Sequence, residues 1–450
     1  MAGPSIELAL VPGPHKHQHT IASTVHGVLS TFAFFLWIPL HLLYHHVFFR
    51  WRSPLVQVLD RRALNTVGRE AVLHFFLKAY PAFGRPVFAL ALPNKWWKEV
   101  EVVGTKGRWI APPGTEGKRG EDEVVLLWVH GGGFTHDTGG ACLPFHIQLA
   151  KVVNKRGVKF SIFALDYQLA PEKIYPSQLI ETLAAYHYLV NEVGIPPSKI
   201  CIGGDSAGGN LTAAFLLHLA RPNPKVMVPA ELGATPGRPG SALLVSPYVD
   251  LVSFSPSYYP PFEADYLDQA GLFPCALQYV GVLERDYPPE LSGWRHSPSW
   301  NPLRWFGGKA GDPVPKELAL DTSLTAEEAE KDGKGLEMLS SPYVNPTPAL
   351  VKDMEWYKEA FPGEGRTLVM WGSKEIFADD IAAFFTALKT AGVAPVDIVK
   401  PFAVHDWVLF DSFLPFHSRD KNGGEQAQPL YGLNKVADFL VAQADEVDDK

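Results

Sequence analysis

Cysteine is scarce in this sequence: 450 residues contain only three, Cys142, Cys201 and Cys275. Three thiols so widely spaced are too few for a disulfide framework or a zinc site built on cysteine. Basic residues are also in the minority, and the formal net charge of −8 at pH 7 argues against nucleic acid as a partner. We therefore predict a protein that needs no metal, no cofactor and no nucleic acid.

Low-complexity tracts and internal repeats are also missing from the sequence. The composition, 46% apolar and 20% charged, is typical of a globular protein that can bury a large core. A chain of 450 residues is long for one domain. α/β folds nevertheless reach this length when the connections between strands carry insertions.

Charge is absent from one long stretch near the N-terminus. Between Thr20 and Phe49 there is no Asp, Glu, Lys or Arg, a length that suffices for a membrane-spanning helix. Arg50 and Arg52 follow the stretch and favour a cytosolic catalytic domain, although the orientation stays open. We predict a single-pass anchor within residues 1–52. The apolar residues expected at its centre are Phe32, Phe35, Trp37 and Leu40.

Pro39 and several histidines make this stretch a poorer membrane span than a run of leucines would be. The alternative is an amphipathic helix that lies on a surface or covers the mouth of the active site. A cleaved signal peptide is disfavoured, because no short basic region directly precedes the apolar run.

From residue 99 onward, short β-like runs alternate with stretches of helical periodicity. Several of the runs are continuously apolar, as expected for parallel strands that are buried on both faces. The alternation predicts an α/β fold with a mostly parallel central sheet flanked by helices. The expected strands are Glu99–Val103, Val124–Val129, Phe160–Leu165, Ile200–Ile202, Ala242–Val245, Thr367–Trp371 and Val396–Val399.

Insertions interrupt this alternation. Residues 222–240 are rich in Pro and Gly and are expected to form a loop. Residues 252–340 are first unusually aromatic and then polar. We predict that 252–340, together with a helical segment at 53–95, forms cap elements on a catalytic domain that spans 53–450.

A G-x-S-x-G motif follows one of the apolar runs and precedes a helical stretch: Gly204-Asp205-Ser206-Ala207-Gly208. In this context the motif is typical of a nucleophile elbow, a strand-to-helix turn too sharp for side chains beside the serine. The turn would expose Oγ of Ser206 at the N-terminus of the following helix. We therefore predict that Ser206 is a nucleophile.

A second glycine-rich motif, His130-Gly131-Gly132-Gly133, follows an earlier apolar strand. Acyl transfer from an ester builds negative charge on the carbonyl oxygen, and backbone N–H groups must already point at it. Glycines let the backbone approach that oxygen closely. We predict that the N–H groups of Gly132, Gly133 and Ala207 form an oxyanion hole.

A general base must take the serine proton. His405 follows the last expected strand, where the chain order serine, acid, histidine places it. His417 is a later and weaker candidate. The neighbouring Asp406 is expected to point away from the imidazole.

The carboxylate that orients the imidazole should follow the strand expected at 367–371. Glu375 lies directly after that strand. Asp379 and Asp380 begin the next helix, where acidic residues are expected as caps and dipole partners. Glu375 is therefore the favoured acid, and Asp379 is the alternative.

These motifs together resemble the hormone-sensitive-lipase branch of the α/β-hydrolases. The block Asp-Tyr-Gln-Leu-Ala-Pro-Glu at residues 166–172 is similar to a structural element of that family, with Gln168 where the family has arginine. At the acid the family usually has Asp followed by Pro-Leu, whereas this chain has Glu375-Ile376-Phe377. This departure concerns the identity of the acid, not the mechanism.

An N-terminal anchor joined to such a domain is similar to the arylacetamide deacetylases and the fungal steryl acetyl hydrolases. The resemblance implies a serine carboxylic-ester hydrolase of lipid metabolism at the endoplasmic reticulum, or in the cytoplasm if the apolar stretch is no anchor. It would remove a short acyl group such as acetyl from a bulky apolar alcohol. An acyltransferase or amide hydrolase with the same residues stays open. So does a non-catalytic binding protein of this fold, like the plant gibberellin receptors.

Overall fold

The computed structural model covers a short N-terminal stretch and most of the chain from residue 96 onward. The described residues are 6–13, 96–115, 120, 123–258, 265, 267, 269–282, 335–412, 425, 428 and 430–448. The predicted anchor, with Phe32, Phe35, Trp37 and Leu40, the segment 53–95 and His417 lie outside them. No helix among the described residues has both the length and the apolar character needed to cross a membrane.

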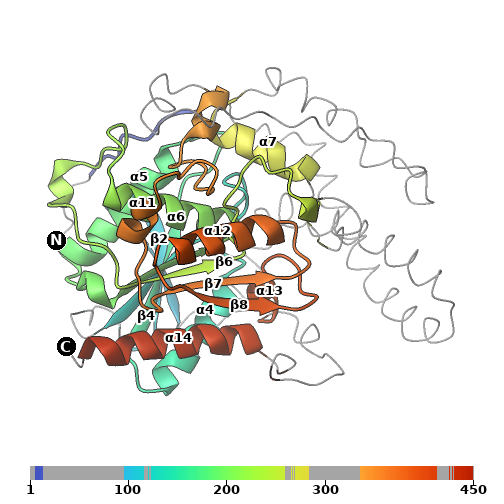
Figure 1. Cartoon of the computed structure of the whole chain (residues 1–450). Coiled ribbons are helices and arrows are strands. Elements are labelled where there is room, and N and C mark those ends of the chain that lie inside the picture. Colours follow the sequence, from blue (N-terminus) through green and yellow to red (C-terminus); the bar gives the residue numbers. More distant parts are fainter. Residues whose placement is uncertain are drawn as a thin grey trace, which may run out of the picture.

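An eight-stranded sheet forms the centre of the structure (Figure 1). Its strand order is β1-β2-β4-β3-β5-β6-β7-β8. β2 pairs antiparallel with β1 and β4, and all other neighbouring strands are parallel. The strands are β1 (Trp97–Val102), β2 (Thr105–Ile110), β3 (Val124–Val129), β4 (Phe160–Asp166), β5 (Ile200–Asp205), β6 (Ser241–Val245), β7 (Thr367–Gly372) and β8 (Val396–Lys400). The mostly parallel sheet predicted from the sequence is confirmed.

The inner strands β3, β5, β6 and β7 are buried along their whole length. Helices cover both faces of these strands, which explains why they read as continuous apolar runs. β2 was not predicted. Its sequence includes Lys106 and Arg108, and Arg108 is buried because its guanidinium pairs with Asp166 of β4 at 2.6 Å.

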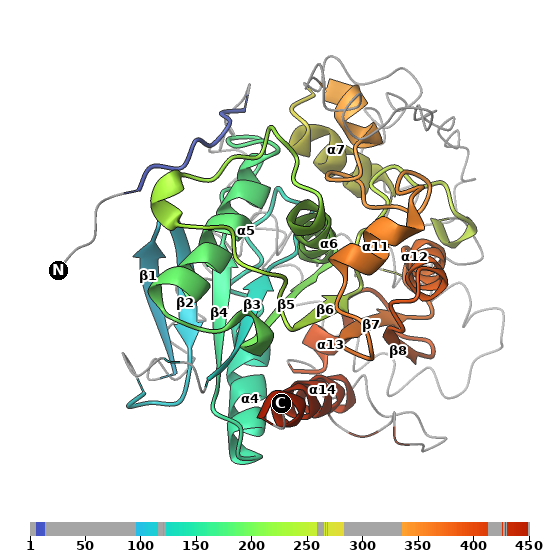
Figure 2. The same ribbon diagram turned by 60° about the vertical axis from the view of Figure 1, so that its left-hand side comes forward.

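Two groups of helices pack on the two faces of the sheet (Figure 2). The first buries its apolar side chains in the core with Val125, Leu127 and Val129 of β3, and the second does so with Leu126 and Trp128. The first group is α5 (Ser177–His187), α6 (Ser206–Ala220), α11 (Met354–Ala360) and α12 (Ala378–Thr390); the second is α4 (Leu143–Lys155), α13 (Trp407–Phe410) and α14 (Tyr431–Asp448).

One helix of the predicted cap lies within the described residues, α7 (Gln269–Tyr279). The ring of Tyr279 stacks on Phe134 at a centroid distance of 3.7 Å. Thr135 Oγ1 donates a hydrogen bond to Sγ of Cys275 at 3.3 Å. α7 therefore packs directly on the glycine-rich loop that follows β3.

The N-terminal strap, residues 6–13, also belongs to this folded body. The N–H of Gly13 donates to the carbonyl oxygen of Glu172 at 2.9 Å. Leu8 is buried in the same core cluster as α5 and α6. The sequence shows no periodicity that would have predicted this docking.

Candidate active site

Ser206 lies at the junction of β5 and α6, where β5 ends at Asp205 and α6 begins at Ser206. Its φ is +52°, in the left-handed region that non-glycine residues rarely occupy. Such a strained backbone at a strand-to-helix turn is the signature of a nucleophile elbow. The local context predicted for Ser206 is therefore present.

Packing explains the two glycines of the elbow. A Cβ on Gly204 would lie 2.4 Å from the carbonyl oxygen of Val129, and one on Gly208 would lie 1.9 Å from the same atom. Neither distance is compatible with a side chain. β5 and the start of α6 can therefore meet the end of β3 only through glycine.

The glycine-rich loop lies against the elbow. A Cβ on Gly131 would be 2.9 Å from Cβ of Ser206, and the N–H of Gly131 donates to Oδ1 of Asp205 at 3.0 Å. Gly132 and Gly133 have φ of +96° and +60°, which favour glycine. Across the described ranges, no hydrogen bond takes up the N–H of Gly132 or Gly133. These donors are available to a developing oxyanion, whereas that of Gly131 is not.

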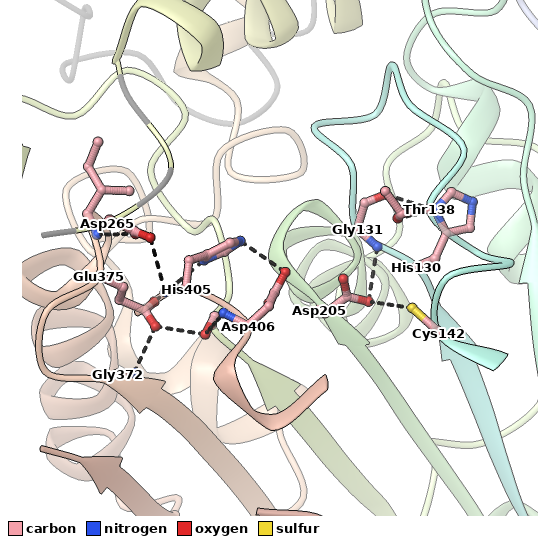
Figure 3. A network of polar contacts seen from close by, with 12 residues as sticks. His130, Gly131, Thr138, Cys142, Asp205, Asp265, Gly372, Glu375, His405 and Asp406 are labelled. Atoms are coloured by element: carbon pink, nitrogen blue, oxygen red, sulfur yellow. Dashed lines mark hydrogen bonds and ion pairs between the residues drawn. The ribbon is translucent and has the colours of Figure 1, made fainter. Parts of the chain in front are cut away.

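His405 follows β8 and is 2% exposed, with carboxylates at both ring nitrogens (Figure 3). Nδ1 lies 3.8 Å from Oε1 of Glu375, longer than a hydrogen bond, and Nε2 lies 3.2 Å from Oδ2 of Asp406. The expectation that Asp406 points away is wrong. Asp406 has φ of +54°, and this left-handed turn brings its side chain back toward its neighbour.

Glu375 lies in the turn after β7 and is 1% exposed. Its Oε2 accepts hydrogen bonds from the N–H of Gly372 and from Oγ of Ser246, both at 2.8 Å. Asp379 instead accepts from the N–H of Ser257 at 2.8 Å. Of the two acids weighed from the sequence, the structure brings Glu375 to the imidazole.

Burial and charge act against each other at this pair. Burial disfavours charge on His405, but Asp406 and Glu375 outweigh it and hold the pKa of the imidazole well above its usual 6.5. Burial raises the pKa of Glu375, while the contact with His405 and the bond from Gly372 oppose that rise. The imidazole is therefore in an environment that favours the imidazolium.

Comparisons with known proteins agree with this architecture. A family profile described as the alpha/beta hydrolase fold matches residues 126–303. A solved structure of an esterase from the bacterial hormone-sensitive lipase family superposes with a TM-score of 0.53 at 22% identity, covering 87% of this chain and 99% of that one. The described domain is an α/β-hydrolase similar to hormone-sensitive lipase.

Curated relatives match over shorter lengths. Hormone-sensitive lipase of Mus musculus is 37% identical over 100 residues, which is 22% of this chain and 12% of the relative. An acetyl-hydrolase of Streptomyces hygroscopicus is 27% identical over 192 residues, which is 42% of this chain and 56% of the relative. The alignments thus span at most about half of either relative.

Two residues of the hydrolase site were missed by sequence reasoning. Ser246 is fully buried after β6, and its Oγ donates to Glu375 while accepting from the N–H of Asp406 at 3.1 Å. Asp265 accepts from the N–H groups of His405 at 3.3 Å and Ile376 at 2.8 Å. Both hold the loops of the acid and the base. Only the position of Ser246 directly after a buried strand could have indicated it.

His130 supports the hydrolase loop rather than the chemistry. Its ring stacks on Tyr167 at a centroid distance of 4.3 Å, and the Tyr167 hydroxyl donates to the His130 carbonyl oxygen at 2.8 Å. Burial lowers the pKa of His130, so the ring is neutral near pH 7. A neutral Nδ1–H can then donate to the carbonyl oxygen of Gly131 at 2.8 Å.

One group of described residues has the composition of a metal site. Ligand atoms of His130, Asp137 and Asp166 lie within 4.8 Å of one another. Asp166 is already paired with the guanidinium of Arg108 at 2.6 Å, a contact that supplies the positive charge a cation would bring. We assign this group to the support of the glycine-rich loop.

Proposed function

We propose that this protein is a serine carboxylic-ester hydrolase. The observation that carries the proposal is the direct packing of the glycine-rich loop on the elbow serine, with the N–H groups of Gly132 and Gly133 free of other partners within the described chain. A strained serine beside unoccupied backbone donors is what acyl transfer requires. The similarity to proteins named as lipases and esterases supports the proposal.

In the proposed reaction, Oγ of Ser206 attacks the ester carbonyl carbon while Nε2 of His405 takes the hydroxyl proton. The carbonyl oxygen becomes an oxyanion held by the N–H groups of Gly132, Gly133 and Ala207. The tetrahedral intermediate then expels the alcohol, which receives the proton from His405. Water activated by the same imidazole hydrolyses the acyl-enzyme, and Glu375 stabilises the imidazolium in both half-reactions.

A short acyl group is the substrate feature that the structure favours. Sγ of Cys275 would lie 3.1 Å from a Cβ placed on Gly133, so α7 leaves little room beside the oxyanion loop. The similarity to a protein named acetyl-hydrolase points the same way. We propose an acetyl or similarly short acyl group on a bulky apolar alcohol.

Product analysis with the purified protein tests the proposed substrate. Acetylated sterols and aryl acetates should be hydrolysed at least tenfold faster, by kcat/KM, than the corresponding octanoates, because the longer chain must displace α7. Equal or faster release of octanoate would contradict the proposed acyl preference. Addition of an alcohol acceptor to the same assay separates hydrolysis from acyl transfer, and acetanilides test amide cleavage.

We further propose that the uncharged stretch between residues 20 and 49 binds the protein to a membrane, such as that of the endoplasmic reticulum. Deletion of residues 20–49 keeps the N-terminal strap and should shift the protein from the membrane pellet to the supernatant. Fractionation with and without detergent measures this. Recovery of the intact chain in the detergent-free supernatant would contradict membrane binding.

A further inference from the structure

Asp406 makes a contact that the proposed mechanism does not use. Its Oδ2 lies 3.2 Å from Nε2 of His405, the nitrogen that must accept the Ser206 proton. The side-chain exposures are 2% for His405 and 11% for Asp406, so water screens this charge contact little. A carboxylate at this position competes with the serine for the base.

A structural role does not account for the Asp406 carboxylate. Asp406 precedes the first residue of α13, where an aspartate often caps the helix, but its side chain makes no capping hydrogen bond. The bond to Oγ of Ser246 uses its backbone N–H, not its carboxylate. The side chain is therefore directed at His405 instead of serving the helix.

The other charged or titratable groups around His405 come from four separate elements. Glu375 faces Nδ1 from the turn after β7, and Asp265 of the cap region accepts from the backbone N–H of His405. Asp205 at the end of β5 interacts electrostatically with both His405 and Asp406. The Cys142 thiol before α4 has a raised pKa through burial and stays uncharged. Among these groups, only Asp406 lies at Nε2.

We propose that Asp406 is a positioning residue that holds His405 as an imidazolium in the free enzyme and delays its use as a base to higher pH. This inference rests on the proposed esterase function. While Nε2 carries a proton shared with Asp406, it cannot accept the proton of Ser206. Loss of that proton to solvent leaves a lone pair facing a carboxylate, which removes the attraction and frees Nε2 for Ser206.

The direction of the pH effect follows from charge. Activity requires the neutral imidazole, so every anion that raises the pKa of His405 moves the onset of activity to higher pH. Asp406→Asn removes one anion but keeps a side chain that tolerates positive φ. The acid limb of the pH profile should then move to lower pH by about 1–3 units, the usual effect of an adjacent opposite charge.

The test is the pH dependence of fluorophosphonate labelling of Ser206, together with kcat/KM on p-nitrophenyl acetate. The wild-type midpoint is expected above ~6.5, the ordinary value for histidine. Asp406→Asn should lower it and, about one unit below the wild-type midpoint, label roughly 5–10 times faster relative to its own plateau. Asp397→Asn, the same charge change at an exposed position of β8, is the matched control and should leave the midpoint in place.

A wild-type midpoint at or below ~6.5 would overturn the inference, and this measurement needs no variant to fold. An unmoved or raised midpoint in Asp406→Asn would also overturn it while leaving the esterase function standing. Absence of labelling at every pH would overturn the esterase function itself, and the role of Asp406 with it.

Discussion

Ser206→Ala should abolish hydrolysis of p-nitrophenyl acetate, lowering kcat by several orders of magnitude. The reason is the loss of the nucleophile, since alanine has no oxygen to form the acyl-enzyme; the comparable loss in a serine protease is ~10⁶-fold. The residue is only 6% exposed and its side chain is small, so the fold should survive. Steady-state kinetics and labelling with a fluorophosphonate probe measure the effect.

Ser257→Ala is a suitable control for Ser206→Ala, because Ser257 is another buried serine that lies outside the elbow. It should keep probe labelling. Activity of Ser206→Ala within tenfold of the wild type, or labelling at another serine, would remove Ser206 from the proposed mechanism. Circular dichroism confirms that the variants are folded.

Glu375→Gln should lower kcat by ~10⁴-fold while changing KM little, as loss of the orienting carboxylate does in a serine protease. An amide cannot stabilise the imidazolium that forms at His405, and it can present the wrong hydrogen-bonding group to Nδ1. Glu375→Asp should also be impaired, because the shorter side chain retreats from an imidazole that is already 3.8 Å away. Parallel kinetics on both variants measure this.

Asp379→Asn is the matched control for Glu375→Gln. Its carboxylate accepts from the N–H of Ser257 at the start of α12 and makes no contact with His405, so its loss should cost roughly 0.5–2 kcal/mol of stability and little activity. A large fall in kcat in Asp379→Asn with near-normal Glu375→Gln would transfer the role of the acid to Asp379.

The sheet could be predicted because its strands are buried on both faces. Continuous apolar runs such as Val124–Val129 are visible without knowledge of their neighbours. β2 could not be found this way, because its Arg108 is buried only through pairing with Asp166 on the adjacent strand. Its strand character comes from tertiary contacts between distant segments, which local propensity does not record.

The same distinction applies to the site. The positions of Ser206 and His405 follow from local motifs, because elbow geometry and chain order are encoded in neighbouring residues. The contact of Asp406 with His405 depends on one positive φ, and the role of Ser246 depends on three loops meeting at one hydroxyl. Such convergence is a property of the assembled fold.

The N-terminal strap limits how the intervening chain can meet a membrane. Gly13 is bonded to Glu172 and Trp96 leads into β1, so both ends of the segment 14–95 are fixed to one folded body. A single crossing of a bilayer would place the strap and the sheet in different compartments. The single-pass arrangement expected from the sequence would therefore require the strap to detach. With the strap docked, any bilayer contact of this segment enters and leaves from the side that holds the hydrolase domain.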